Sequence, residues 1–324
     1  MNKILVILGP TSSGKSDIAI KMAKKFNGEI ISADSRQIFR GMDIGTGKVE
    51  GRLVEVGPQQ AAVGGPTSTR GMTKKIFMSQ DIPHYMIDIV SPRTDFNVAK
   101  FKKQSDKIIT DILNRGKLPI ICGGTGFWIQ AIVDDVNFPE VKPDWKLRER
   151  LEKHSPEKLF LMLKKLDRER SQNIDSKNKV RLIRAIEICK KIGKVPSIKN
   201  TKYQIRNTKY KTLQIGLKLS REKLYANIEK RVLARFKQGM TKEVENLHTQ
   251  TGLSWKKIQS FGLAYFWIPL YLQNKISKKE LLEKVIQVEK NYAKRQMTWF
   301  NRDKRIKWLE NYKKIEKSAK YFLR

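Results

Sequence analysis

Residues 4–16, ILVILGPTSSGKS, join a short apolar run to a glycine-rich loop. The run at residues 4–8 has the length of a strand and no polar alternation, which is typical of a parallel strand buried on both faces. Residues 9–16 match the pattern G-x-x-x-x-G-K-[ST], and residues 16–26 have the apolar spacing of a helix. A strand, this loop and a helix in this order predict a site for a diphosphate or triphosphate group.

Each residue type in the loop has a physical role in holding phosphate. Glycines let the backbone wrap around the group, and the amides and the helix N-terminus direct positive dipole toward it. Lys15 adds a full charge, and the hydroxyl of Ser16 can hold Mg²⁺. The predicted phosphate-binding residues are Gly9, Pro10, Thr11, Ser12, Ser13, Gly14, Lys15 and Ser16.

Strand and helix patterns continue after the loop. Residues 29–33 and 117–122 are apolar runs of strand length, and residues 101–115 between them have an amphipathic helical pattern. This alternation predicts an α/β fold with a parallel sheet core, similar to the P-loop NTPases. In the second half we expect a strand at residues 212–219 and one long helix at residues 221–248, with helices in the remainder.

Two stretches interrupt this rhythm. Residues 51–80 mix glycine, proline, serine and threonine without a period, so we expect a mobile surface loop there. Residues 140–200 have helical patterns with charged faces and predict a small helical domain inserted into the chain. The core is then formed by residues 1–139 and 201–324, and residues 197–212 are expected to be a polar linker.

The charge of the chain is large and uneven. There are 67 Lys and Arg against 32 Asp and Glu, a net charge of +35. The first 130 residues have 19 basic and 11 acidic side chains, and the remaining 194 have 48 and 21. We therefore expect a polyanion against the later part of the chain, with nucleic acid the first candidate and an anionic membrane surface the second. Lysine-rich, solvated helix faces account for part of the excess.

Cysteine, histidine and apolar content exclude other classes. The two cysteines and three histidines have no spacing typical of a zinc site or a disulfide framework, so a cytoplasmic protein is expected. No apolar stretch approaches the ~18 residues of a membrane span, so no membrane segment is expected.

Further candidate residues follow the other predicted strands. Asp34 comes after the second strand and should lie at the carboxyl edge of the sheet, beside the loop. Its carboxylate can act as a general base or organise Mg²⁺, and capping of a loop is the structural alternative. Thr125, in the turn GGTG after the third strand, can donate to a phosphate or a base, although the turn alone is a weak signal. Arg231 and Arg235 lie on the long helix, where either guanidinium can neutralise a leaving diphosphate.

Six segments share their order and spacing with a known family. They are GPTSSGKS at 9–16, ISADSRQIFRGMDIGTGK at 31–48, IPHYMIDIVSP at 82–92, GGTGFWI at 123–129, RLIRAIEI at 181–188 and AKRQMTWF at 293–300. Together they resemble bacterial tRNA dimethylallyltransferases over nearly the whole chain. The DSRQ and GMDIGT block is far more specific than the phosphate loop.

The resemblance implies a definite reaction. The family transfers a dimethylallyl group from dimethylallyl diphosphate to N6 of the adenosine at position 37 of tRNA, in the anticodon stem-loop, uses Mg²⁺ and releases diphosphate. Carried over by motif, residues 11–16 bind the donor, Asp34 is the general base, Thr125 belongs to the catalytic set, and Arg231 holds the diphosphate. The resemblance also implies a monomer.

The resemblance further assigns contacts with tRNA in several parts of the chain. Apart from the resemblance, the basic side chains at positions 148, 181 and 184 are candidates for contacts with the phosphate backbone, and a solvated helix face is the alternative. The residues expected to contact tRNA are Asp34, Ser35, Arg36, Gln37, Thr125, Arg148, Val180, Arg181, Leu182, Ile183, Arg184, Gln259, Ser260, Phe261 and Gly262.

The chain departs from the family pattern at three places. Gly262-Leu263-Ala264 stands where the family usually has Gly-Tyr and a basic residue. Asn227 stands where many members have arginine, and Trp128 where tyrosine is common. The first of these bears on a tRNA contact. The insert at residues 51–80 has no counterpart in the family pattern either. None of the departures replaces a residue of the loop at 9–16, Asp34, Thr125 or Arg231.

Three other functions are compatible with a phosphate loop. A small-molecule kinase shares the loop and a following Asp, but it does not explain the basic second half or the GMDIGT block. An RNA-binding GTPase requires N-K-x-D, and both Asn-Lys pairs, at 178–179 and 274–275, are followed by the wrong residues. An adenylate prenyltransferase that forms cytokinin does not require the basic insertion at residues 140–200.

Overall fold

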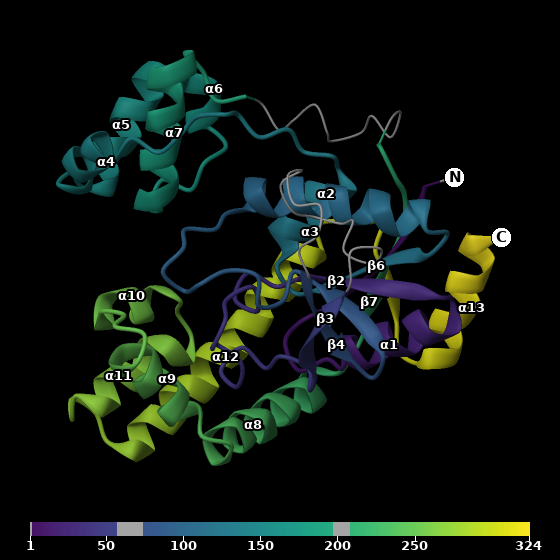
Figure 1. Cartoon of the computed structure of the whole chain (residues 1–324). Helices are drawn as coiled ribbons and strands as arrows, with labels where there is room; N and C mark the ends of the chain where they lie inside the picture. Colours follow the sequence, from purple (N-terminus) through teal and green to yellow (C-terminus); the bar gives the residue numbers. More distant parts are fainter. Residues whose placement is uncertain (1, 57–73, 197–207) are drawn as a thin grey trace. The chain divides into compact units, whose positions relative to one another are not determined.

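A computed structural model describes residues 2–56, 74–196 and 208–324 of the chain (Figure 1). The chain divides into two compact units. The larger unit contains Met1–Asp135 and Thr208–Arg324, and the smaller unit contains Val136–Asn207. The smaller unit is therefore inserted between two parts of the larger one, where the sequence suggested an insertion at residues 140–200.

The larger unit is built on one eight-stranded sheet with the order β3-β4-β5-β2-β6-β1-β7-β8. β1 pairs in parallel with β6 and β7, and β2 pairs in parallel with β5 and β6. The α/β class with a parallel sheet core is confirmed, and the carboxyl ends of β1, β2 and β6 meet at one edge. The strands are β1 Lys3–Leu8, β2 Gly28–Ala33, β3 Arg52–Val56, β4 Lys74–Ser79, β5 Ile82–Tyr85, β6 Leu118–Gly123, β7 Lys211–Leu217 and β8 Lys307–Leu309.

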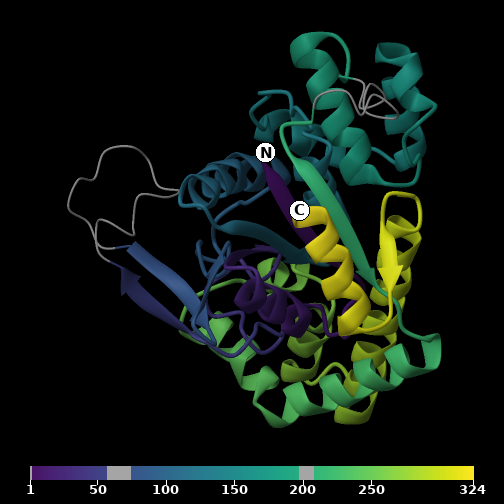
Figure 2. The ribbon, with the colours of Figure 1, turned by 90° about the vertical axis from the view of Figure 1, so that its right-hand side faces the viewer.

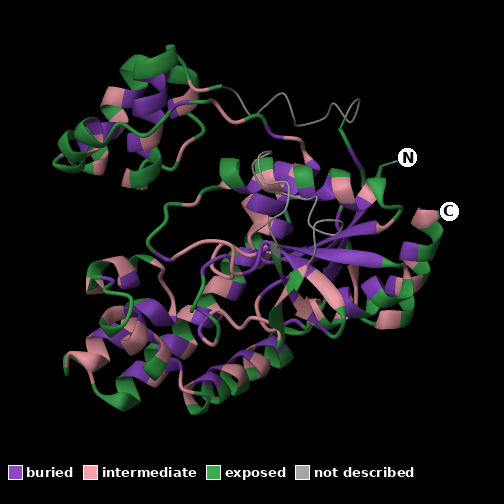
Figure 3. Ribbon diagram, in the orientation of Figure 1, coloured by how far each residue is buried: buried purple, intermediate pink, exposed green. Residues whose placement is uncertain are grey.

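Helices cover both faces of the sheet, which explains why its central strands are continuously apolar. Successive side chains of a strand point to opposite faces. Along β1, Ile4, Val6 and Leu8 contribute to the hydrophobic cluster that includes α2, whereas Leu5 and Ile7 belong to the cluster that includes α1 and α13. Figure 3 shows the central strands as buried, and Figure 2 shows α13 beside the sheet. These helices are α1 Lys15–Lys25, α2 Val98–Asn114, α3 Gly126–Val133 and α13 Tyr312–Leu323.

The second half of the larger unit contains five further helices. They are α8 Arg221–Lys237, α9 Met240–Thr249, α10 Trp255–Ser260, α11 Ala264–Leu272 and α12 Lys278–Phe300. The expectation of one helix at residues 221–248 is wrong, because Gly239 adopts a φ of 97° and ends the helical path between α8 and α9. The expectation of helices alone in the remainder is also wrong, since β8 pairs in parallel with β7. Among the described helices, none is long and apolar enough to cross a membrane.

An antiparallel pair of strands replaces part of the loop expected at residues 51–80. β3 and β4 pair with Leu53 opposite Phe77 and Val54 opposite Ile76. Ile76 and Phe77 are buried within the larger unit, and this burial stabilises the strand pair. The apolar pattern of the segment is too short to predict a strand from the sequence. The expectation for residues 57–73 lies outside the described residues, as does the part of the linker expected at 197–212 that ends at residue 207. The last two residues of that expected linker, Lys211 and Thr212, belong to β7, so the linker is shorter than predicted.

The smaller unit is helical and has a core of its own. Its helices are α4 Trp145–Glu152, α5 Pro156–Leu166, α6 Arg168–Ser171 and α7 Lys179–Ile192. Leucines from α4 and α5 pack against Leu182 and Ile186 of α7. The buried carboxylate of Glu187 accepts hydrogen bonds from Arg148 at 2.8 Å and from the N–H of Asp144 at 2.7 Å, and it pairs with Arg184. Although burial disfavours its charge, these bonds lower the pKa of Glu187 to about 2.

A buried carboxylate also anchors the amino end of the sheet in the larger unit. Glu29 of β2 is 1% exposed and accepts hydrogen bonds from Arg115 at 2.6 Å, Lys117 at 2.7 Å and the hydroxyl of Tyr85 at 2.8 Å. Burial by itself raises the pKa of Glu29, but the hydrogen bonds outweigh burial and lower that pKa to about 2. The ionised carboxylate therefore ties β2 to the segment that leads into β6.

Replacing Glu29 by Gln should destabilise the protein without altering the chemistry at the opposite end of β2. We expect Glu29→Gln to lower the free energy of unfolding by about 3 kcal/mol at pH 7, because it leaves buried donors without their charged acceptor. A carboxyl group with a lowered pKa stabilises above its unfolded pKa of about 4.5 and loses this effect as the pH falls toward 2. The gap between the two proteins should therefore narrow from pH 7 to pH 3 in urea unfolding. Glu55→Gln, at an exposed ion pair, is the control, and equal stabilities of Glu29→Gln and wild type would contradict the assignment.

Candidate active site

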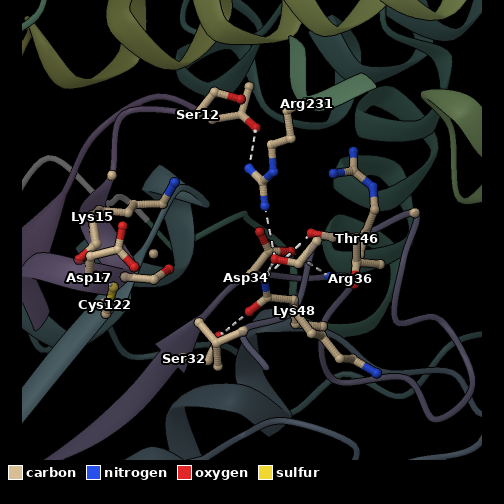
Figure 4. Close-up of a pocket in the computed structure, with 18 of the residues that line it drawn as sticks. Ser12, Lys15, Asp17, Ser32, Asp34, Arg36, Thr46, Lys48, Cys122 and Arg231 are labelled. Carbon is tan, nitrogen blue, oxygen red and sulfur yellow. Dashed lines mark hydrogen bonds between the residues drawn. The ribbon is translucent and has the colours of Figure 1, made fainter. Parts of the chain in front are cut away.

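A cavity of about 500 Å³ lies at the carboxyl edge of the sheet in the larger unit (Figure 4). The loop after β1, Asp34 after β2 and Gly123 at the end of β6 line one side of it. Arg231 of α8 and Gln296 of α12 line it as well. Parallel strands end at the same edge, so segments far apart in the sequence meet here.

The predicted phosphate loop turns sharply before the first helix. Ser12 and Gly14 have φ values of 60° and 82°, and α1 begins immediately afterwards at Lys15. The Lys15 ammonium donates to the carbonyl oxygen of Pro10 at 3.1 Å. Burial lowers the pKa of Lys15, and the positive charge of Arg231 lowers it further. Because burial and like charge both disfavour the ammonium ion, an anion bound in the cavity would stabilise it.

Arg231 joins the phosphate loop to the second glycine-rich segment. Its Nη1 donates to Oγ1 of Thr11 at 3.5 Å, and its Nη2 donates to the carbonyl oxygen of Gly47 at 2.9 Å. Burial and then the neighbouring Arg235 guanidinium lower the pKa of Arg231 to about 10. Gly47 must be glycine, because its φ is 60° and a Cβ there would overlap the guanidinium groups of both arginines.

Asp34 is held in a fixed orientation at the end of β2. Its Oδ1 accepts a hydrogen bond from the N–H of Arg36 at 2.9 Å. The next residue, Ser35, donates its N–H to Oγ1 of Thr125 at 3.1 Å. The structure therefore brings Asp34, the phosphate loop and Arg231 to one cavity, with Thr125 tying the turn after β6 to the segment that follows Asp34.

The GMDIGT segment forms a structured wall of the cavity. A single carboxylate, that of Glu243 on α9, accepts the consecutive backbone N–H groups of Asp43, Ile44 and Gly45 at 2.6–3.1 Å. The hydroxyl of Tyr265 donates to the same carboxylate at 2.7 Å. Three amides on one carboxylate fix the path of this segment, and so fix the Gly47 carbonyl that orients Arg231.

Gln296 lines the cavity, although no role was predicted for it from the sequence. Its Oε1 accepts the N–H of Thr11 at 2.8 Å, and its Nε2 donates to the carbonyl oxygen of Gly124 at 2.9 Å. One buried side chain of α12 thus connects the loop after β1 to the turn after β6. The segment AKRQMTWF contains this glutamine and was a usable signal, whereas no local pattern marks Glu243.

The predicted tRNA contacts of the larger unit divide into two groups. The first group lines the cavity. The guanidinium carbon of Arg36 lies 5.0 Å from the ring centroid of Tyr292, and Nε of Arg36 donates to the carbonyl oxygen of Phe261 at 3.0 Å. Gln37 also lines the cavity and accepts from Ser32 at 3.0 Å. Gln259, Ser260 and Gly262 are the neighbours of Phe261 in the chain, at the end of α10. The ring of Phe261 packs against that of Phe39, with 5.1 Å between the ring centroids.

The structure corrects two of the predicted tRNA contacts in the smaller unit. Leu182 and Ile183 are 0% and 3% exposed and belong to the core of that unit, so their side chains are not available to RNA. A helix that packs on a core buries one of its faces, so five consecutive residues of it cannot all present their side chains to RNA. Val180 and Arg181 are exposed, whereas Arg148 and Arg184 are both bound to Glu187.

The three departures from the family pattern have definite places. Asn227 donates through Nδ2 to the carbonyl oxygen of Ser12 at 3.4 Å, so it contacts the phosphate loop. Trp128 is buried and stacks on Phe101 with 4.3 Å between ring centroids. Leu263 lines the cavity with an unusual backbone of φ 49° and ψ −130°.

These features define the class of the protein. A glycine-rich loop between a buried parallel strand and a helix, facing a cationic cavity, is characteristic of P-loop proteins that bind diphosphate or triphosphate groups.

Comparison with known proteins narrows this class. The chain matches the model of a family described as IPP transferase over residues 71–303, and that of isopentenyl transferase over residues 2–56. It is 38% identical to a tRNA dimethylallyltransferase of Acetivibrio thermocellus, over 100% of this chain and 98% of that relative. The structure of a tRNA delta(2)-isopentenylpyrophosphate transferase from Staphylococcus epidermidis is 36% identical, covers 99% of both chains and has a TM-score of 0.66. That of a tRNA isopentenylpyrophosphate transferase from Bacillus halodurans is 29% identical, with 100% and 96% of the two chains covered and a TM-score of 0.66. The chain belongs to the IPP transferase family.

The bridge made by Gln296 gives a test of the loop geometry. Gln296→Leu leaves the N–H of Thr11 and the carbonyl of Gly124 without their partner, so we expect inorganic diphosphate to bind about tenfold more weakly. Isothermal titration calorimetry measures this affinity directly. Gln287→Leu on the same helix, whose side chain bonds to the nearby Asn291, is the matched control and should bind as wild type does. Equal affinity in Gln296→Leu and wild type would show that the bridge does not shape the site.

Proposed function

We propose that this protein is a tRNA dimethylallyltransferase that acts as a monomer in the cytoplasm. It transfers a dimethylallyl group from dimethylallyl diphosphate to N6 of the adenosine at position 37 of tRNA and releases diphosphate. The observation that carries the proposal is the meeting of Lys15, Arg231 and Asp34 on one cavity. Two cations and a carboxylate are the groups that a diphosphate leaving group and an amine nucleophile require.

The donor diphosphate binds between the phosphate loop and Arg231. The bond from C1 of the prenyl group to the bridging oxygen breaks while the bond from C1 to N6 forms. Lys15, Arg231 and the loop amides hold the negative charge that develops on the diphosphate. Since Arg231 already contacts Thr11 of the loop, the same guanidinium reaches a phosphate group bound there.

Asp34 accepts the proton that N6 loses. An exocyclic amine is a weak nucleophile, because its lone pair is delocalised into the purine ring, so removal of its proton assists attack. The N–H of Arg36 fixes Oδ1 and gives the carboxylate one direction. To reach this group the adenosine leaves its stack and enters the cavity, as bases modified by enzymes generally do.

The residues of the cavity suit Mg²⁺ bound together with a diphosphate. Among the described residues, no group of three or more His, Cys, Asp or Glu could enclose a metal ion. Mg²⁺ does not need such a cage, since it keeps waters and takes phosphate oxygens together with one or two protein oxygens. The hydroxyl of Ser16 lines the cavity and is a hard oxygen donor that would hold Mg²⁺. When bound, Mg²⁺ neutralises charge on the diphosphate.

The smaller unit supplies cationic surface for the RNA. Its α7 exposes Arg181, and its α4 exposes Trp145, whose ring lies 5.1 Å from the guanidinium of Arg148. An exposed aromatic ring beside a cation is a favourable surface for an unpaired base, and exposed arginine suits the phosphate backbone.

Asp34→Asn tests the general base. Asparagine keeps the oxygen that accepts from Arg36 but removes the charge, so we expect turnover to fall by about 10²–10⁴-fold while the stem-loop binds as before. The assay follows transfer of a radiolabelled prenyl group from dimethylallyl diphosphate, with Mg²⁺, to an anticodon stem-loop with adenosines at positions 36–38. Asp81→Asn, at an exposed turn, is the control and should be fully active.

The acceptor decides between the proposal and its alternatives. Free AMP offered in place of the stem-loop should remain unmodified. Prenylation of AMP and not of RNA would indicate an adenylate prenyltransferase, and phosphate transfer from ATP without prenyl transfer would indicate a kinase. Normal turnover of Asp34→Asn would remove that residue from the mechanism.

Arg181 tests the RNA surface of the smaller unit. Each phosphate contact releases counterions, so we expect Arg181→Gln to reduce the salt slope of stem-loop binding by about one, to a similar extent for different sequences. Binding is measured by fluorescence anisotropy between 50 and 300 mM KCl. Lys313→Gln on α13 is the control. A slope unchanged by Arg181→Gln, or reduced equally by Lys313→Gln, would argue against this contact.

A further inference from the structure

A buried ion pair forms part of the cavity wall, and the proposed mechanism does not use it. Arg235 of α8 is 5% exposed and Glu289 of α12 is 3% exposed. Nη1 of Arg235 lies 3.2 Å from Oε1 of Glu289, and both residues line the cavity. Removing two charges from water is costly, and apolar side chains of similar volume often give equal or greater stability. The position of this pair on the cavity therefore suggests a role in binding.

The pair leaves hydrogen-bonding capacity of Arg235 unused. Among the described residues, Nε of Arg235 is buried and has no hydrogen-bond partner. A Cβ at Gly47 would overlap Nη2 of both Arg231 and Arg235, so the two guanidinium groups are neighbours across this glycine. A planar fork of donors with a free N–H beside a second arginine has the geometry with which phosphate oxygens are bound.

The charges around the cavity are unbalanced in the direction that an anion would correct. Burial and then Arg235 lower the pKa of Arg231 to about 10, while Glu289 acts in the opposite direction. Burial lowers the pKa of Lys15 as well, and Arg231 and Arg235 add to this effect. Six basic and three acidic side chains line the cavity, the acidic ones being Asp17, Asp34 and Glu289, so a ligand with several negative charges would relieve the repulsion.

We propose that Arg235 is a second guanidinium ligand of the diphosphate and that Glu289 is the positioning residue that holds it on the cavity wall. The chemistry recognised is the diphosphate group itself, common to the donor and to the released product. That this diphosphate carries a prenyl group rests on the function proposed above. Arg231 then contacts the diphosphate from the side of Thr11, and Arg235 contacts it from the side of α12.

Binding of inorganic diphosphate with Mg²⁺, measured by isothermal titration calorimetry, tests Arg235 without reliance on turnover. Arg235→Met removes the guanidinium, and we expect about tenfold to hundredfold weaker binding, the effect of one charge-assisted contact. Arg235→Lys, which keeps the charge, should recover part of the affinity. Lys237→Met, the same loss of a cation at an exposed position of the same helix, is the matched control and should bind as wild type does.

A double variant separates a binding role from a structural one. Arg235→Met combined with Glu289→Leu replaces the ion pair by apolar side chains, and we expect it to recover the melting temperature that Arg235→Met loses. Under the proposal, the double variant gains only the roughly threefold to tenfold in diphosphate affinity that loss of the Glu289 charge gives, and it binds more weakly than Glu289→Gln, which keeps Arg235. If the double variant binds diphosphate as tightly as Glu289→Gln does, or if Arg235→Met binds diphosphate as wild type does, the proposal is overturned.

Glu289→Gln gives an independent prediction, in which diphosphate binds more tightly than to wild type rather than more weakly. Glutamine keeps the oxygen that accepts from Nη1 but removes the negative charge that competes with the ligand, so diphosphate should bind about threefold to tenfold more tightly. Weaker binding in this variant would contradict the assignment. Since every arm uses inorganic diphosphate, a protein that fails to prenylate RNA but follows this pattern would refute the proposed reaction and leave the role of Arg235 standing.

Discussion

Lys15, Arg231 and Arg235 place three positive charges around one cavity, and much of the larger unit serves to hold them there. Like charges in a site of low polarity repel, which is why burial and neighbouring arginine lower the pKa of Arg231 to about 10. The fold maintains this arrangement with hydrogen bonds from elements remote in sequence. The Gly47 carbonyl orients Arg231, and Glu289 neutralises part of the charge on Arg235. An anion site kept ready in this way would require little rearrangement to bind the diphosphate of the proposed reaction.

Helix α12 is the element that turns two separate loops into one site. Glu289, Tyr292 and Gln296 are three and four residues apart, so they project from one face of the helix, and all three line the cavity. Gln296 satisfies a donor of the loop after β1 and an acceptor of the turn after β6. The sheet brings these two loops to the same edge, where Leu8 pairs with Gly123, and the Gln296 side chain from outside the sheet joins them directly. The most carboxyl-terminal of the long helices therefore controls the geometry of the amino-terminal motif.

The features that could be predicted from the sequence are those in which local pattern and chemistry coincide. The phosphate loop, Asp34 and the parallel strands each have a signal within a few residues. Glu243 has none, because its function depends on three amides about two hundred positions earlier in the chain. The strands β3 and β4 were missed since each is short and gains its stability from pairing. The end of α8 was missed because the apolar spacing continues past Gly239 and only its positive φ reveals the break.

Residues 180–184 show why a motif is a poor guide to individual contacts. The segment lies on α7, where one face packs into the core of the smaller unit, so Leu182 and Ile183 support the helix rather than meet a ligand. The arginines of this unit are also divided between an internal role and the surface. Arg148 and Arg184 share the buried carboxylate of Glu187, while Arg181 is exposed. A guanidinium bound to a buried carboxylate has lost much of its attraction for a distant phosphate, since the pair is close to neutral from afar. Net charge counted along the sequence therefore overstates the positive surface that this unit can offer to a polyanion. Under the proposed function, we therefore expect the arginines without an internal carboxylate, such as Arg181, to contribute most to RNA binding.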